Sequence, residues 1–332
     1  MLPLLQRFAC LLGIVLMAGC ASGPKPYTTS ERKLHTPPRF LLEWGHKGTN
    51  AGEFTSPIGI AVGPRDEVFV AEFNASRVQR FNSRGIPLGQ FPTLKNPGGI
   101  AVDRDGRCYV SSMTQHKVAV YDTWGNPLAE WGDIKGAGDN QFSQPGGIVI
   151  GPDDAVWIAD QGNHRVVRYS MEGKFLGKFG RHGKEPGQFG GVTNAGSRFG
   201  GPQFIAFDNQ QTIYTTEASS GRIQRLDMEG RPLGAWGDNN DGPGGFGGRP
   251  KDDRTPLPGP IAIWVDRLGR VWIGATNNRV QLFTRDGRFL LQLGGDGTGP
   301  GQFHLPHGMA TDSKGNVYVV DASNQRIQKF AP

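Results

Sequence analysis

The stretch QFHLPHGMATDSKGNVYVVDASNQRIQKF, residues 302–330, holds the first three strands of a unit that the chain repeats six times. The unit opens with a large apolar residue three positions before a proline, here Phe303 and Pro306. The same spacing occurs at Phe54 and Pro57, Leu94 and Pro97, Phe142 and Pro145, Phe199 and Pro202, and Leu257 and Pro260. A supersecondary unit that recurs every 40 to 58 residues is typical of a propeller or a solenoid.

Each unit predicts four β-strands. An apolar run after the proline and a second β-rich run, separated by a turn of Asp, Gly and Pro, predict two strands. A third opens with a cation and closes on a large apolar residue; the cations are Arg77, Lys117, Arg165, Arg222, Arg279 and Arg326. In five units a glycine follows, as a tight hairpin requires, and then a fourth strand in which a leucine precedes an apolar or aromatic residue by three positions.

The sixth unit lacks its fourth strand, because the sequence ends at Phe330-Ala331-Pro332. The missing signature stands near the N-terminus, in Phe40-Leu41-Leu42-Glu43-Trp44-Gly45. A closed ring gains from this pairing because it covers strand edges, whereas a solenoid does not need it. We therefore predict an all-β fold, a six-bladed β-propeller over residues 39–332, closed by a strand at about 39–45 that completes the last blade.

Two loops resemble those of NHL repeats: Asp160-x-x-Asn163-x-Arg165 and Asp321-x-x-Asn324-x-Arg326. The resemblance covers residues 39–332 and implies the same propeller fold. It does not decide function, because NHL propellers include RNA binders, protein-interaction platforms and a lyase. The acid and cation pairs of these loops admit two interpretations, a ligand-binding ring or bridges within each blade. We favour the second, because a feature repeated in most blades serves their architecture.

The first 38 residues predict export and lipid anchoring. Arg7 precedes a short apolar run, Phe8 to Met17, and Leu16-Met17-Ala18-Gly19-Cys20 resembles the bacterial lipobox. We expect a signal peptide at 1–19, a lipid on Cys20 and a flexible tether to residue 38. A plain signal peptide with an incidental cysteine is the alternative. The anchored protein would be extracytoplasmic, on the outer membrane and facing the periplasm if the host is Gram-negative.

Charge and cysteine content narrow the function classes. The net charge of +6 falls to +3 from Arg39 onward, where 32 basic residues face 29 acidic ones. A nearly neutral, exported ring gives no reason to expect nucleic-acid binding. Once Cys10 is removed and Cys20 acylated, Cys108 alone remains, so no intramolecular disulfide is expected. Its apolar strand position predicts a small buried hydrophobe.

Function is expected where the repeat breaks. Propeller topology puts the connections between blades and the loops between second and third strands on one face, and the longest connections are Arg181 to Gly201 and Asp238 to Gly259. Mobile decoration without function is the alternative for these loops. The predicted partner-binding residues are His46, Arg181, His182, Arg198, Asp238, Asp241, Arg254, His304 and His307.

Metal binding is the main question about this face, because six of the seven histidines lie in or beside its loops: His46, His116, His164, His182, His304 and His307. The phrase Gly301 to Gly308 resembles the peptide-amidating lyase among NHL-type propellers, which implies zinc at the channel mouth with His307 as one ligand. The matching positions of the other blades hold Ile58, Gly98, Gly146, Gln203 and Ile261, and one histidine does not hold zinc. We therefore expect no metal there. Asp238-Asn239-Asn240-Asp241-Gly242 is a calcium alternative, but we read it as a solvated turn.

The sequence thus predicts a non-enzymatic envelope lipoprotein, monomeric and without a cofactor. Its loop-rich face would bind a protein, peptide or cell-wall partner. The alternative from another class is a metal-dependent lyase or hydrolase, with zinc or calcium as cofactor and the site near His307.

Overall fold

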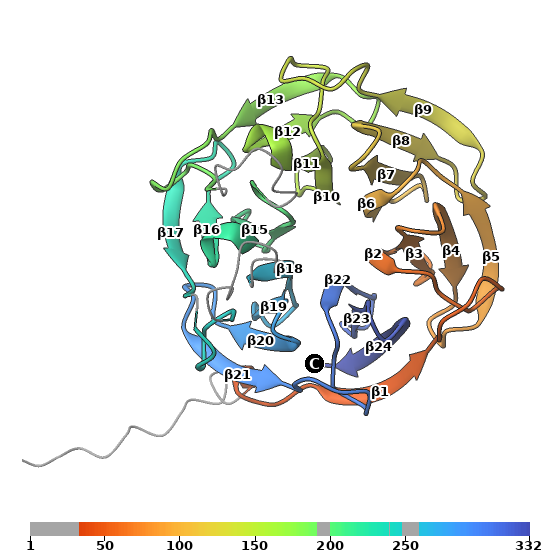
Figure 1. Ribbon diagram of the computed structural model, residues 1–332, viewed down its shortest axis with the longest axis vertical. Coiled ribbons are helices and arrows are strands. Elements are labelled where there is room, and N and C mark those ends of the chain that lie inside the picture. Colours follow the sequence, from red (N-terminus) through yellow and green to blue (C-terminus); the bar gives the residue numbers. More distant parts are fainter. Residues whose placement is uncertain (1–32, 191–199, 239, 248–258) are drawn as a thin grey trace, which may run out of the picture.

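The computed structural model describes residues 33–190, 200–238, 240–247 and 259–332. Over these ranges the chain forms six four-stranded antiparallel sheets arranged as blades around a central axis (Figure 1). The predicted six-bladed β-propeller is confirmed. Within each blade the strand that follows the proline lies nearest the axis, and the later strands follow outward. No helix in the described ranges has the length and apolar character needed to cross a membrane.

The strands of the first three blades, from the axis outward, have these bounds. Blade 1 holds β2 (Pro57–Val62), β3 (Val68–Glu72), β4 (Arg77–Phe81) and β5 (Pro87–Pro92). Blade 2 holds β6 (Pro97–Val102), β7 (Cys108–Ser112), β8 (Lys117–Tyr121) and β9 (Pro127–Trp131). Blade 3 holds β10 (Pro145–Ile150), β11 (Val156–Asp160), the short 3-10 helix η1 (Gln161–Asn163), β12 (Arg165–Tyr169) and β13 (Phe175–Phe179).

The other three blades follow the same order. Blade 4 holds β14 (Ile205–Phe207), β15 (Ile213–Glu217), the 3-10 helix η2 (Ala218–Ser220), β16 (Arg222–Leu226) and β17 (Pro232–Trp236). Blade 5 holds β18 (Pro260–Val265), β19 (Val271–Ala275), β20 (Arg279–Phe283) and β21 (Phe289–Leu293). Blade 6 holds β22 (Pro306–Thr311), β23 (Val317–Asp321), β24 (Arg326–Ala331) and, outermost, β1 (Arg39–Trp44).

At five of the six junctions, neighbouring blades are joined by an aromatic side chain that packs on a glycine. The aromatic residue is the one that follows the fourth-strand leucine by three positions, and the glycine is that of the next blade's hairpin. A Cβ added to Gly173 would lie 2.3 Å from Nε1 of Trp131, so no larger residue fits. The same contact joins Phe91 to Gly125, Phe179 to Gly230, Trp236 to Gly287, and Trp44 to Gly85. The aromatic residue of the fourth-strand signature and the hairpin glycine of the next unit are therefore the two sides of one contact between blades.

The ring closes through β1, as predicted. Trp44 pairs with Ile327 of β24, the same register in which Leu293 of β21 pairs with Val280 of β20. The pairing of β1 also shifts at Leu41, the position at which the pairing of β21 shifts at Leu290. The N-terminal strand thus copies the fourth strand of an ordinary blade.

The residues before β1 also belong to the ring. The backbone carbonyl of Thr36 accepts a hydrogen bond from Nη1 of Arg270 at 2.8 Å, and Arg270 is fully buried. Leu34 packs against a hydrophobic cluster that blades 5 and 6 share, which contains Leu290 and Phe330. In blade 1 the corresponding position is occupied by the hairpin before the fourth strand. The carbonyl of Ser83 in that hairpin accepts a hydrogen bond from Lys329 of blade 6, as Thr36 does from Arg270. The segment that the sequence assigned to the tether therefore contacts blade 5 from Leu34 onward.

The acid and arginine pairs hold the blades together. Nε of Arg165 donates to Asp160 at 2.8 Å, and its other nitrogens donate to the carbonyls of Ala137, Gly138 and Gln141 in the incoming connection. The pairs Arg77 and Glu72, Arg222 and Glu217, and Arg326 and Asp321 repeat the arrangement. The guanidinium groups of these arginines donate their hydrogen bonds to the paired acid and to backbone carbonyls, which agrees with the interpretation that the pairs bridge parts of each blade.

Replacing Arg165 by Met should cost about 3–5 kcal/mol of unfolding free energy, because Asp160 is then left buried without its cation. The matched control is Arg231→Met, which breaks an ion pair with Asp227 whose arginine side chain is 74% exposed and should cost less than about 1 kcal/mol. Urea unfolding of both variants measures the difference. Equal losses would contradict the architectural role.

Three truncated chains distinguish the contribution of the tether to stability from that of the closing strand. Removing residues 1–32 should leave the unfolding midpoint unchanged, because the sequence predicts a signal peptide and a flexible tether there. Removing 1–38 should lower the midpoint by a few degrees, since buried Arg270 loses the Thr36 carbonyl and the cluster of blades 5 and 6 loses Leu34. Removing 1–45 should lower it most, because β24 loses its partner. Equal midpoints for all three chains in calorimetry would refute closure by β1.

Candidate functional site

The connections between blades share one face of the ring. In each antiparallel blade the first strand begins, and the fourth strand ends, at the same end of the sheet. The loop between the second and third strands lies at that end too, so the connections between blades lie beside these loops. We call this the loop-rich face. The opposite, plain face carries short turns and hairpins. The exposed side chains of His46, His182 and His304 all belong to loop-rich connections.

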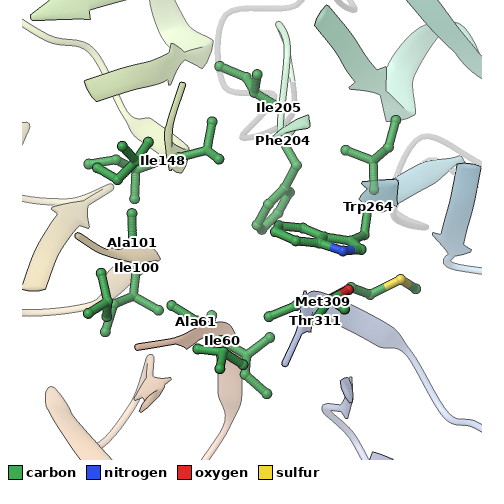
Figure 2. A pocket seen from close by; sticks show the side chains of 18 residues that line it. Ile60, Ala61, Ile100, Ala101, Ile148, Phe204, Ile205, Trp264, Met309 and Thr311 are labelled. Atoms are coloured by element: carbon green, nitrogen blue, oxygen red, sulfur yellow. The ribbon is translucent and has the colours of Figure 1, made fainter. Parts of the chain in front are cut away.

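A cavity of about 140 Å³ occupies the axis and is lined by the innermost strands of all six blades. Its wall is mainly isoleucine, valine and alanine, and Figure 2 shows Phe204 and Trp264 reaching into it from one side. An apolar cavity with a few polar atoms is the usual form of a small-ligand pocket. The volume is close to that of an engineered cavity of about 150 Å³ that holds benzene, so one ring or one branched side chain fits.

The wall departs from the repeat in blades 4 and 5. Two positions after the proline, four blades carry a glycine: Gly59, Gly99, Gly147 and Gly308. Blade 4 has Phe204 there, and its innermost strand is reduced to Ile205–Phe207. Four positions after the proline, four blades carry an alanine: Ala61, Ala101, Ala206 and Ala310. Blade 5 has Trp264 there. Two adjacent blades thus fill with aromatic rings the space that the others leave open.

His307 completes this group from blade 6. Its ring packs edge to face on Phe204, with centroids 5.4 Å apart. Burial lowers the pKa of His307 to about 4, so the imidazole is neutral at pH 7. Nδ1 of His307 and Nε1 of Trp264 are buried and have no hydrogen-bond partner among the described residues. His307 is not among the residues that line the cavity, so it supports the site through its contact with Phe204.

The channel does not fit the zinc site that the lyase resemblance implied. His307 supplies one imidazole, and the described residues contain no group of three or more His, Cys, Asp or Glu side chains able to hold an ion. Asp238 to Gly242 is organised as a turn within its described part, because Asn240 bonds both the Asp238 carboxylate and the Gly242 backbone. Neither stretch presents a set of converging ligands.

The other predicted face residues are exposed but dispersed. Arg181, His182, Asp238 and Asp241 lie in the two long connections. His304 faces Asp296 of its own connection, with 3.3 Å between Nδ1 and the carboxylate oxygen. Arg198, Arg254 and the proposed lipid site Cys20 lie outside the described residues. Cys108 is fully buried, and burial raises its thiol pKa to about 12, as expected for a structural residue.

Phe204 and Trp264 were missed from the sequence. The signal was present, since both are large residues at positions where most repeats carry glycine or alanine. The signal is weak because an aromatic residue in an apolar strand is also what packing in the core requires.

Comparison with known families agrees with the repeat geometry. The model of the NHL repeat matches residues 54–81, 142–169 and 303–330, which belong to blades 1, 3 and 6. The protein is a six-bladed propeller of NHL repeats. Blade 2, which carries Ser112 and Lys117 in place of the acid and arginine, is not among the matched stretches.

Similar curated proteins match over short stretches. NHL repeat-containing protein 3 of Homo sapiens is 39% identical over 75 residues, which are 21% of this chain and 22% of that protein. Peptidyl-glycine alpha-amidating monooxygenase B of Xenopus laevis is 33% identical over 90 residues, 25% of this chain and 10% of that protein. The chain therefore spans about a fifth or less of the length of these NHL-repeat relatives.

Solved structures resemble nearly the whole ring. Virginiamycin B lyase of Staphylococcus aureus has a TM-score of 0.56 and 17% identity, covering 88% of this chain and 98% of that one. A gluconolactonase of Xanthomonas campestris has a TM-score of 0.59 and 17% identity, covering 89% and 95%. At these identities the likeness of this NHL propeller to them concerns the fold.

The low pKa of His307 predicts a pH dependence. The unfolded histidine takes up a proton near pH 6.5, whereas the folded one stays neutral to about pH 4, so stability falls as the pH drops through this window. His307→Gln, which places the residue of blade 4 (Gln203) at this position, should remove up to about 3 kcal/mol of that loss. Urea unfolding at pH 7 and pH 4 measures it. An identical loss in both proteins would show that His307 is not buried.

Proposed function

We propose that the protein is a non-enzymatic binding protein of the cell envelope. It is anchored through Cys20, and its loop-rich face holds a protein or peptide segment that inserts one apolar side chain into the channel. The observation that carries the proposal is the pair of aromatic side chains Phe204 and Trp264 in the wall of the cavity, where the innermost strands depart from the repeat, with His307 packed against Phe204. Phe204 and Trp264 shape an apolar site, and the described residues of its wall include no acid or base.

Two further features support binding. The side chains of Arg181, His182 and His304 are exposed around the connections of the same face, so a partner seated over the channel meets polar groups. An apolar pocket surrounded by polar side chains is how anchors of protein interfaces are held. The cavity admits one ring or branched side chain, which favours a peptide over a cell-wall glycan.

The alternative is a lyase or hydrolase, which some similar folds support. The similar structures include a lyase and a gluconolactonase, and a neutral His307 with an unpartnered Nδ1 is chemically able to accept a proton. The geometry favours binding because no described residue in the wall of the cavity has a titratable side chain.

Site-specific photocrosslinking tests the proposal in intact cells. A photoreactive amino acid is placed at His304 on the loop-rich face or, as control, at Trp124, which is 69% exposed on the plain face. We expect a discrete crosslinked peptide or protein from position 304 only. Phe204→Gly with Trp264→Ala, which restores the residues of the other blades, should abolish that product while leaving the unfolding midpoint within a few degrees.

Equal crosslinking from both faces, or a product that survives the double variant, would contradict the proposal. Elemental analysis beside His307→Ala tests the alternative. A stoichiometric metal that the variant loses would favour the enzyme.

A further inference from the structure

One inter-blade hydrogen bond recurs around the ring. The last residue of the loop between second and third strands accepts it, and the donor is the N–H just before the next blade's first proline. It runs from Asn96 to Ser76, from Gln144 to Nδ1 of His116, from Leu305 to Asn278, and from Ser56 to Gln325. The bond ties these four connections to the blades that they leave, whereas blade 4 has Gly221, without a side chain, at the accepting position.

Blade 3 breaks this pattern. His164 holds the accepting position, in left-handed backbone with φ 54°, but its Nδ1 is buried and has no partner among the described residues. Its ring instead faces His182, with centroids 4.6 Å apart and planes at 71°. His182 belongs to the connection between β13 and β14, where it bridges to Phe189. Two imidazoles from separate segments therefore meet where the repeated bond is lost.

The arrangement suits a shared metal ion. Zinc binds imidazole nitrogen at about 2.0–2.1 Å, which puts each ring centre about 3 Å from the ion. Centroids 4.6 Å apart then subtend roughly a right angle at the metal. Neutral imidazole is a preferred ligand of zinc, copper and nickel.

We propose that His164 and His182 form a binding site for a divalent transition metal of the zinc type. The two histidines supply two ligands, and water or a donor group of the partner supplies the others. His182 is exposed, so the open positions face solvent on the loop-rich face. The ion would replace the missing hydrogen bond and fasten the connection to blade 3. This site is separate from the channel and does not depend on the function proposed above.

Blade 2 provides a natural control. His116 stands at the position of His164, but its Nδ1 is occupied by the N–H of Gln144 at 3.0 Å. Lys135 stands at the position of His182, since each makes the same bridge to the phenylalanine seven residues on. The preceding blade thus has the same backbone arrangement without a second imidazole.

The experiment is a titration of the full chain, made without a polyhistidine tag, with Zn²⁺ by calorimetry and with Cu²⁺ by electron paramagnetic resonance. His164→Asn takes the residue of blade 5, and asparagine tolerates left-handed backbone. His182→Lys takes the residue of blade 2. Each should weaken Zn²⁺ binding by about tenfold or more and remove the two-nitrogen coupling of the Cu²⁺ spectrum. The control His116→Asn should retain both.

Unchanged Zn²⁺ affinity in either variant, or an equal loss in His116→Asn, would overturn the site. Loss of the metal in His307→Ala with full retention in both pair variants would do so as well, and would place the ion in the channel.

Discussion

The contact on which the ring depends is the aromatic side chain that packs on the next blade's hairpin glycine. Trp131 on Gly173 shows its constraint, because a single added carbon at the glycine would collide with the indole. Backbone and side chain are both fixed by this contact, since Gly173 also needs a positive φ, here 86°. Repetition of the contact sets the relation between neighbouring blades at five of the six junctions, and Trp44 extends it across the closure to Gly85.

The fold could be predicted from the sequence because each of its determinants is local and repeated. The spacing from Phe303 to Pro306 and the leucine signature of β1 recur in register, so six imperfect copies support one another. The role of Leu34 and Thr36 could not be predicted in this way. They replace a hairpin that has a different sequence, and their partner Arg270 lies 234 residues away.

The candidate sites could be predicted only in part, for the opposite reason. The proposed function rests on departures from the repeat, and a departure has no second copy to support it. His307 stands out in the sequence because histidine is chemically conspicuous, while Phe204 and Trp264 look like ordinary strand residues. The contact of His164 with His182 depends on the path of a connection, and no spacing rule relates two residues on separate segments. The acid and arginine pairs were interpreted correctly because repetition favours architecture.

The pairing of β1 with β24 has a consequence for how the protein is made. Arg326 bonds Glu43 across 283 residues of sequence, so the last blade joins the earliest strand to the latest one. Contacts of such separation form late and slowly, because the loop that they close is nearly the whole chain. A chain that emerges from its N-terminus has an open ring until β24 is free to pair. Until then the edges of β24 and β1 remain exposed, and such edges favour association between chains. Completion of the ring is thus a single late event that requires the entire domain.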